Sequence, residues 1–127
     1  QDFSTREPMK IIIAGSRTFQ DYERLVAICD QLFGSMDLTD APIEIVSGAA
    51  RGADQLGEAY ASSKGYAIQR FPADWARWGK MAGPLRNQAL AAYADGAIIF
   101  WNGKSRGTKH LIRVLKQEGK WLKVVGI

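Results

Sequence analysis

The sequence predicts a single α/β domain: a Rossmann-like, three-layer α/β/α arrangement around a mainly parallel five-stranded sheet. Short apolar runs rich in β-branched residues alternate with helical patterns along the chain, and strands joined by crossover helices form a parallel sheet that is covered on both faces. The length of 127 residues suits one ordinary domain. No repeat, low-complexity run or linker divides the chain, so residues 9–127 are expected to fold as one unit.

The first strand is expected at residues 10–14, an uninterrupted apolar run that is typical of a strand buried on both faces. A helix capped by Asp21 should follow, with apolar residues at helical spacing. Gly34 is expected to end this helix. A polar connection at residues 37–42 then leads into a second strand at residues 43–46.

A helix over about residues 53–64 should precede a third strand at residues 66–71. Because this strand is less apolar than the others, we expect it near the sheet edge. Residues 72–84 contain two Trp, two Gly and two Pro, which predicts a long irregular loop of the kind that is often functional. The remaining elements expected are a helix from about 85 to 93, a strand at 97–101, a helix from about 108 to 119 and a strand at 121–125.

Composition narrows the possible classes of protein. Hydrophobic residues make up 46% and charged residues 24%, as in folded globular chains, and no apolar run approaches the roughly 18 residues that a membrane helix needs. Cys29, the one cysteine, excludes an internal disulfide and is expected in the core, which favours a cytoplasmic location. The net charge of +4 permits an anionic partner, although the charges are dispersed rather than gathered in a basic stripe. Residues 1–8 are expected to be a polar tail or an expression remnant.

Three glycine-containing turns are expected at the carboxyl ends of strands, where ligands bind in open α/β sheets. Each turn leads from a strand into a helix, so it offers free backbone N–H groups and a positive dipole end to an anion. Each also carries an Arg and a hydroxyl, which suit phosphate oxygens. The ligand-binding residues expected in these turns are Gly15, Ser16, Arg17, Ser47, Gly48, Arg51, Gly52, Asn102, Gly103, Ser105, Gly107 and Thr108.

The same turns have a second interpretation, because strand-to-helix connections need Gly and Ser for backbone reasons alone. None of them matches the G-x-G-x-x-G pattern of dinucleotide folds or the Walker A loop. A conventional dinucleotide-binding protein or a phosphate-loop NTPase is therefore not expected.

Aromatic and polar residues follow the third strand. Trp75 or Trp78 could stack on a base, or both could simply seal the core. Arg86 and Asn87 open the next helix, from which they could contact a phosphate or a sugar. We include Trp75, Arg86 and Asn87 among the expected ligand-binding residues.

Asp54 is either a first-turn carboxylate that stabilises its helix or a ligand contact, to hydroxyl groups or through orientation of Arg51. It is also the one candidate for a catalytic carboxylate. His110, the only histidine, is expected to be a surface or packing residue. No His, Cys or carboxylate cluster has metal-ligand spacing, so neither a metal site nor a cofactor is expected.

At these motifs the sequence resembles the SLOG superfamily, which includes the DNA-processing protein DprA and the LOG phosphoribohydrolases, and within it the small single-domain YspA-like proteins. The resemblance implies a Rossmann-like fold, a pocket for a nucleotide or nucleotide-derived ligand, and a homo-oligomer. It implies ligand contacts from the first two turns and from Gly107 and Thr108. The matching segments are residues 13–17, 46–54, 74–75, 79–80, 82–87 and 107–108.

Two departures separate the chain from the named members. LOG enzymes carry a Gly-Thr-x-x-Glu motif whose glutamate serves hydrolysis of an N-glycosidic bond, whereas the motif that begins at Gly107 ends here in Leu111, which cannot activate water. DprA proteins work within longer chains that have added partner-binding parts.

Three hypotheses about function follow. The first is a binding module, a sensor or sequesterer of a phosphorylated nucleoside or an ADP-ribose-like ligand. The second is a nucleoside 5'-monophosphate N-glycosidase or phosphoribohydrolase, with Asp54 as its carboxylate. The third is single-stranded nucleic acid binding, as in DprA, against which the dispersed charge argues. No membrane partner is expected.

Overall fold

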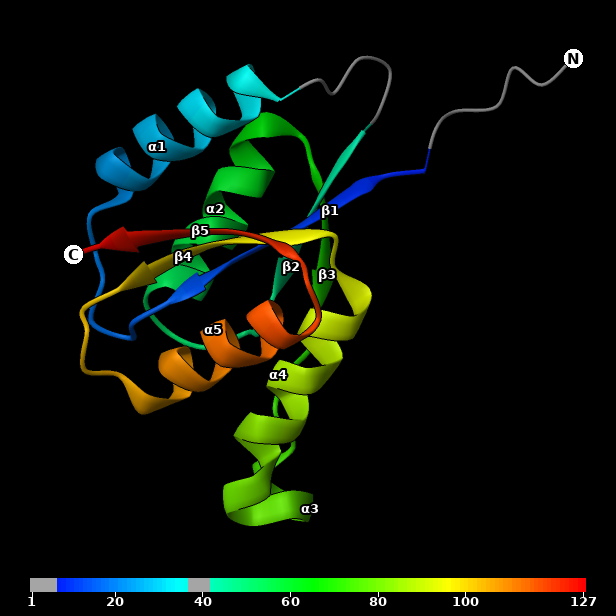
Figure 1. The fold of residues 1–127 in the computed structure, drawn as a ribbon. Coiled ribbons are helices and arrows are strands. Elements are labelled where there is room, and N and C mark those ends of the chain that lie inside the picture. The colour runs from blue at the N-terminus through cyan, green and yellow to red at the C-terminus, as the bar shows by residue number, and fades with distance from the viewer. Residues whose placement is uncertain (1–6, 37–41) are drawn as a thin grey trace, which may run out of the picture.

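The computed structural model describes residues 7–36 and 42–127. Five strands form one sheet in the order β3-β2-β1-β4-β5 (Figure 1), and all neighbouring strands are parallel. The elements are β1 (Met9–Gly15), α1 (Tyr22–Ser35), β2 (Ile43–Ser47), α2 (Ala53–Lys64), β3 (Ala67–Arg70), α3 (Trp75–Trp78), the 3-10 helix η1 (Gly79–Met81), α4 (Ala82–Tyr93), β4 (Gly96–Trp101), α5 (Arg106–Gln117) and β5 (Trp121–Gly126).

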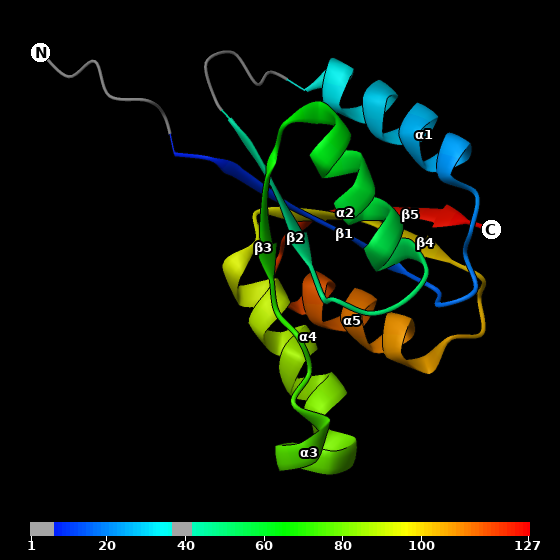
Figure 2. The same ribbon diagram turned by 180° about the vertical axis from the view of Figure 1, so that it is seen from behind.

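Helices cover both faces of this sheet: α1 and α2 lie on one side, and α4 and α5 lie on the other (Figure 2). Successive residues of β1 pack alternately against the two helical layers. Ile11 and Ile13 pack with the α1 and α2 side chains, while Ile12 and Ala14 pack with those of α4 and α5. Two buried faces explain why this strand is an uninterrupted apolar run, and the predicted three-layer fold is confirmed.

The strand order also indicates the edge of the sheet at which a ligand would bind. The chain builds β1, β2 and β3 outward in one direction and then returns to place β4 on the other side of β1. The switch point of the sheet therefore lies between the carboxyl ends of β1 and β4, where ligands bind in such folds. At the far end, β3 pairs only with β2 and leaves most of its side chains exposed, which confirms its predicted edge position.

The predicted end of α1 was wrong. The helix continues through Gly34 to Ser35, and the N–H of Met36 donates to the carbonyl of Phe33. Gly34 has open space around it and no positive φ, so nothing in its backbone requires a helix stop there.

The predicted irregular loop at residues 72–84 was also wrong, because α3, η1 and the start of α4 occupy most of it. The side chain of Asp74 caps α3 by accepting the N–H of Arg77 at 3.1 Å. α4 begins at Ala82, three residues before the predicted start. Pro84 falls in its first turn, where the missing N–H loses no helical hydrogen bond.

Part of the sequence interpretation lies outside the described residues: most of the proposed tail (residues 1–6) and most of the polar connection (residues 37–41). Cys29 is fully buried in the core as predicted, and burial raises the pKa of its thiol to about 12. Across residues 7–36 and 42–127, no helix has the length and apolar character needed to cross a bilayer.

Candidate functional site

Two glycines allow the turns after β1, β2 and β4 to meet. Gly15 has φ +150°, and a Cβ added to it would lie 2.0 Å from the carbonyl oxygen of Phe100 on β4. Gly52 has φ +76°, and its Cβ would lie 2.4 Å from the carbonyl oxygen of Ser16. Both positions combine an unusual backbone conformation with direct contact to another main chain, so they require glycine.

Ser16 is a buried residue whose hydrogen bonds connect all three turns. It is 1% exposed, and its N–H donates to the carbonyl of Phe100 at 2.9 Å. Its Oγ accepts the N–H of Asn102 at 3.1 Å, and its carbonyl accepts the N–H of Ala53 at 3.2 Å. The hydrogen-bonding groups of Ser16 therefore fix the turns to one another.

The hydroxyl of Ser47 also forms its hydrogen bonds within the protein. Its hydroxyl donates to Oε2 of Glu58 at 2.6 Å and accepts the N–H of Ala49 at 3.0 Å. Ala49 has φ +59°, a left-handed conformation that a non-glycine residue seldom adopts and that is found preferentially at functional sites. The Ser47 hydroxyl thus helps to hold a strained turn open toward solvent.

The turns enclose two adjoining cavities that together we call the carboxyl-edge groove. The α5 compartment has a volume of about 200 Å³ and is lined by Ala14, Gly15, Arg17, Ala50, Asp54, Arg86, Asn87, Leu90, Ser105, Gly107, Thr108 and Leu111. The Trp75 compartment, of about 320 Å³, is lined by Arg17, Gly48, Ala49, Ala50, Arg51, Pro72, Ala73, Trp75 and Arg86. Arg17, Ala50 and Arg86 line both, so they form a shared wall.

Asp54 is the buried carboxylate of this groove. It is only 4% exposed, and its Oδ2 accepts the N–H of Ala50 at 3.3 Å. Burial raises the pKa of Asp54 to about 6, against the opposing effects of the Ala50 amide and the positive charge of Arg86. The carboxyl therefore titrates close to neutral pH.

Arg86 is held in place from two sides. Its Nη1 donates to the carbonyl of Gly48, and its Nε donates to Oδ1 of Asn87 at 3.1 Å. Burial lowers the pKa of the guanidinium, the charge of Asp54 raises it, and the charge of Arg17 lowers it. The positive charge of Arg17 therefore acts on Arg86 at the shared wall, and an anion bound there would offset it.

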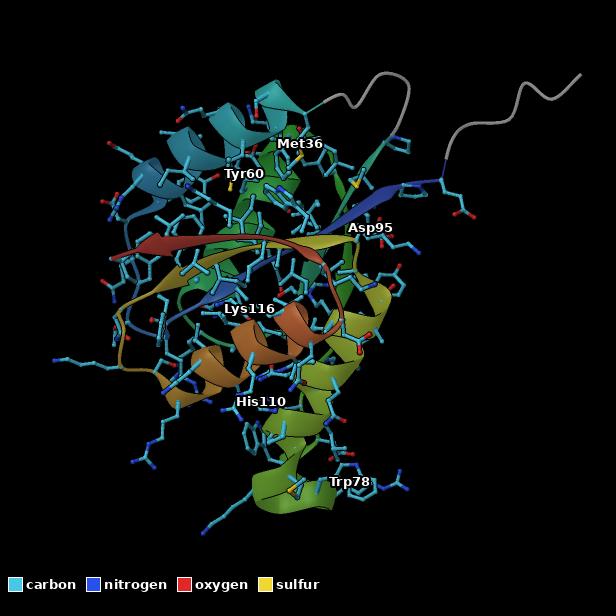
Figure 3. All side chains as sticks on the ribbon, viewed as in Figure 1. Met36, Tyr60, Trp78, Asp95, His110 and Lys116 are labelled. Atoms are coloured by element: carbon cyan, nitrogen blue, oxygen red, sulfur yellow. The ribbon has the colours of Figure 1, made fainter. Side chains whose placement is uncertain are left out.

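Asn87 connects α4 to the first turn of α5. Its Nδ2 donates to the carbonyl of Gly107 at 3.1 Å and lies 3.1 Å from Nδ1 of His110. His110 lies on α5 below the sheet in Figure 3, on the side opposite Tyr60. His110 thereby supports a groove residue, as a packing histidine does.

The turn after β4 divides into structural and groove-lining residues. Oδ1 of Asn102 accepts the N–H groups of Lys104 and Ser105 at 2.9 and 3.0 Å. Ser105 caps α5 by accepting the N–H of Thr108, so the helix begins at Arg106, two residues before the predicted start. Ser105, Gly107 and Thr108 line the α5 compartment, whereas Asn102 and Gly103 line neither compartment.

The two tryptophans of α3 are both exposed, Trp75 by 51% and Trp78 by 48%, so the alternative that they seal the core is wrong. Trp75 lines the groove, and its ring lies beside Gly83, where an added Cβ would be 3.2 Å from the ring. Trp78 points away from the sheet in Figure 3, with the guanidinium of Arg77 4.8 Å from its ring centroid.

The structure therefore brings most of the expected ligand-binding residues to one groove. Eleven of them line it: Gly15, Arg17, Gly48, Arg51, Asp54, Trp75, Arg86, Asn87, Ser105, Gly107 and Thr108. Five do not: Ser16, Ser47, Gly52, Asn102 and Gly103. The lining residues that the sequence did not propose as ligand contacts are apolar or small: Ala14, Ala49, Ala50, Pro72, Ala73, Leu90 and Leu111.

A larger cavity, of about 870 Å³, lies at the opposite edge of the sheet around Phe33, Tyr60 and Lys64. Two of its charged groups pair with each other: Asp30 accepts the hydroxyl of Tyr60 at 2.7 Å and forms an ion pair with Lys64 at 3.0 Å. The third, Glu44, accepts the hydroxyl of Tyr93. Size alone therefore does not make it the better candidate, and we favour the groove because Arg17 and Arg86 line both of its compartments. Within the part of the chain that the structure describes, no three His, Cys, Asp or Glu residues gather as metal ligands.

The fold and groove define a Rossmann-like protein whose candidate ligand site lies at the switch point of a parallel sheet. The family described as the YspA, cpYpsA-related SLOG family (YAcAr) matches residues 9–78. The Gene 61 protein of Mycobacterium phage D29 is 32% identical over 116 residues, which cover 87% of this chain and 90% of that protein. The chain belongs to this SLOG family, and the resemblance inferred from its motifs is confirmed.

Two solved structures share the fold. DNA processing protein A (DprA) from Streptococcus pneumoniae matches with a TM-score of 0.70 and 17% identity, over 92% of this chain and 50% of that one. DprA from Helicobacter pylori, described for its single-stranded DNA binding mode, matches with a TM-score of 0.64 and 21% identity, over 92% of this chain and 65% of that one. The chain thus spans half to about two thirds of these proteins, and at such identities the similarity is one of fold.

Proposed function

We propose that this protein binds a phosphorylated, nucleotide-type ligand in the carboxyl-edge groove. One observation carries the proposal: Arg17 and Arg86 both line the wall that the two compartments share, and the positive charge of Arg17 lowers the pKa of the Arg86 guanidinium. A phosphate between two guanidinium groups accepts charge-assisted hydrogen bonds from both. Membership of the SLOG family agrees with this ligand class.

The surroundings of the arginines suit the rest of a nucleotide. The first turn of α5 adds the positive end of a helix dipole to the groove. Trp75, half exposed at the groove, offers a ring face on which a base can stack, an interaction worth about 1–3 kcal/mol. With these parts the protein acts by binding, as a sensor or a sequesterer of its ligand.

The test is titration calorimetry with a panel of nucleoside monophosphates, nucleoside diphosphates and ADP-ribose, preceded by a thermal-shift screen. Arg17→Ala should weaken binding by about 10-fold or more, because a hydrogen bond to a charged group contributes about 1.5–3 kcal/mol. Arg17 is exposed, so its truncation should leave the fold intact. Arg113→Ala is the matched control, since Arg113 is exposed on α5 and lines neither compartment.

Binding that is equally strong in the wild type and Arg17→Ala would exclude the shared wall as the phosphate site. An absence of binding across the whole panel would overturn the proposal.

Asp54 supports a second candidate function, a nucleoside 5'-monophosphate N-glycosidase. A carboxyl with a pKa of about 6 that lines the groove is able to exchange a proton near neutral pH. Leu111 lines the same compartment, where it offers no carboxylate of its own. This candidate predicts that free base is released from a nucleoside monophosphate and that Asp54→Asn stops the release, as chromatography of the reaction would show.

Exposed Trp75 and Trp78 support a third candidate, single-stranded nucleic acid binding, the property for which the Helicobacter pylori DprA structure is described. This candidate predicts affinity that rises with oligonucleotide length and falls steeply with salt. A homo-oligomer and a cytoplasmic location stay predictions, which light scattering and cell fractionation test.

A further inference from the structure

We propose that Glu58, which lies on α2 and lines neither compartment of the groove, is a positioning residue for the ligand site. It acts through the hydroxyl of Ser47 on the turn at residues 48–50, and through this turn on Arg86. Glu58 thus serves the proposed function, on which this inference rests, by keeping an arginine of the groove in place.

The two oxygens of the Glu58 carboxylate bind side chains from two neighbouring strands. Oε2 accepts the hydroxyl of Ser47, the last residue of β2, at 2.6 Å. Oε1 accepts Nε of Arg70, the last residue of β3, at 2.8 Å. Ser47 is fully buried, whereas the Arg70 side chain is 57% exposed. The bond to Ser47 is therefore shielded from water, and the ion pair with Arg70 contributes little by itself.

The Ser47 hydroxyl has one proton, and Glu58 determines where that proton points. A carboxylate that is paired with Arg70 only accepts hydrogen bonds, so Ser47 donates its proton to it. A lone pair of the hydroxyl is then left for the N–H of Ala49, whose nitrogen lies 3.0 Å from Oγ. The Ser47 backbone is held separately, because its carbonyl accepts the N–H of Phe71 at 2.8 Å. Loss of Glu58 would therefore free the hydroxyl and leave the strand in place.

The turn held by this hydroxyl contains one strained residue and two groove contacts. Ala49 has φ +59°, a conformation that persists in a non-glycine residue only where the surrounding bonds support it. The carbonyl of Gly48 accepts Nη1 of Arg86, and the N–H of Ala50 donates to Oδ2 of Asp54 at 3.3 Å. A relaxed turn would therefore release Arg86 from Gly48 and displace the wall of the Trp75 compartment to which all three turn residues belong.

The first test is titration calorimetry with the same panel of nucleoside monophosphates, nucleoside diphosphates and ADP-ribose. Glu58→Ala should weaken binding by about 10-fold, because Arg86 loses one of the bonds that fix it. Glu58→Gln keeps an oxygen that can accept the Ser47 hydroxyl and should restore the affinity to within about 3-fold of the wild type. Arg70→Ala is the matched control. It removes the exposed partner of Glu58, leaves the Ser47 bond, and should not change the affinity.

A double-mutant cycle separates the action through Ser47 from a general effect of Glu58 on the fold. Ser47→Ala alone should weaken binding about as much as Glu58→Ala. In the Ser47→Ala background, Glu58→Ala should cost no further affinity, because the hydroxyl that it orients is already absent. Urea denaturation of the same four proteins shows whether the affinities follow stability instead.

NMR spectra of the isotope-labelled protein without ligand give a result that does not depend on binding. Glu58→Ala should shift the amide signals of Ala49 and Ala50 and the Nε–H signal of Arg86, whereas Arg70→Ala should leave these three signals in place. The dispersion of each spectrum also shows whether the variant is folded.

The possible failures are distinguishable. If members of the panel bind the wild type and Glu58→Ala equally well, the inference is overturned and the proposed function stands. Equal losses in Glu58→Ala, Glu58→Gln and Arg70→Ala would also overturn it, because the ion pair and not the hydroxyl bond would then be responsible. If no member of the panel binds the wild type, the proposed function is overturned. The NMR comparison then decides alone, and an Arg86 signal that is unchanged in Glu58→Ala overturns the positioning role.

Discussion

Gly52 is the residue at which one added methyl group would most directly disturb the groove. Its φ of +76° disfavours alanine, and the new Cβ would lie 2.4–2.5 Å from backbone atoms of Ser16 and Arg17. We expect Gly52→Ala to lower the free energy of unfolding by about 2 kcal/mol or more, from backbone strain and displacement of the first turn. Urea denaturation measures this change.

Gly107→Ala is the control for that experiment, because Gly107 has no atom within 4 Å of an added Cβ and lies in the first turn of a helix. Its stability should stay within about 0.5 kcal/mol of the wild type. A Gly52→Ala variant as stable as Gly107→Ala would show that the two turns are not in contact.

Asp54 should give the protein a measurable pH dependence of stability. Its pKa rises from 3.8 to about 6 on folding because it is buried, so the folded state holds more protons than the unfolded state between these values. The stabilisation from Asp54 is present below about pH 4 and is lost as the pH rises through about 6.

Asparagine does not titrate, so the wild type should lose on the order of 2–3 kcal/mol of unfolding free energy relative to Asp54→Asn between about pH 4 and pH 7.5. Denaturant titrations of both proteins across this range give the difference between their unfolding free energies. The contributions of all other titrating groups are the same in both proteins and cancel in this difference. A difference that stays constant with pH would contradict the burial of this carboxyl.

For single residues, the sequence predicts which of them lie near the same edge of the sheet but not the partner to which each side chain bonds. Glycine, Arg and hydroxyl residues after three strands are enough to expect Arg17 and Thr108 at one edge. Ser16 and Ser47 have the same residue type as a phosphate-binding serine, yet their hydroxyls bond to Asn102 and Glu58. These partners are brought close only by the folded sheet, so no local pattern distinguishes the two roles.

Among the elements, α1 gives the simplest test of the observed boundaries. Because the helix runs through Gly34 and leaves open space around it, Gly34→Ala should raise the free energy of unfolding by about 0.5 kcal/mol. Gly65, with φ +76° at the C-terminal cap of α2, also has open space. Gly65→Ala should lower the same quantity by about 1 kcal/mol.

The two variants together separate backbone conformation from packing, since neither new methyl group would meet another atom. Thermal or urea unfolding gives both values. Destabilisation by Gly34→Ala would mean that the helix does end at Gly34, as its sequence alone suggested.

α3 shows where element prediction fails and why. Trp, Gly and Pro within residues 72–84 mark a break in regular structure, yet Asp74 and the N–H of Arg77 form an N-terminal cap three residues apart. That spacing was available in the sequence but is weak evidence for a helix of only four residues. α3 projects beyond the sheet at the N-terminal end of α4 (Figure 2). None of its residues is buried, so its sequence lacks the apolar pattern of a helix that packs on the core.

For the whole molecule, the fold is predictable because strands that are buried on both faces are nearly continuous apolar runs in the sequence. β1 and β4 are apolar at almost every position, and β3 at the edge is not. The groove is less predictable, because its shape depends on how turns separated by more than 80 residues meet at the switch point. Ser16 and Asn102, which join two of those turns, are 86 residues apart.

The most direct test of the central claim is an amide NMR titration of the isotope-labelled protein with AMP and with ADP-ribose. We expect the largest shift changes at the carboxyl edge, in residues 15–17, 48–54 and 105–108, and we expect Arg17→Ala to reduce them. Changes that instead concentrate around Phe33, Tyr60 and Lys64 would place the ligand in the larger cavity at the opposite edge. That result would contradict the assignment of the carboxyl-edge groove as the binding site.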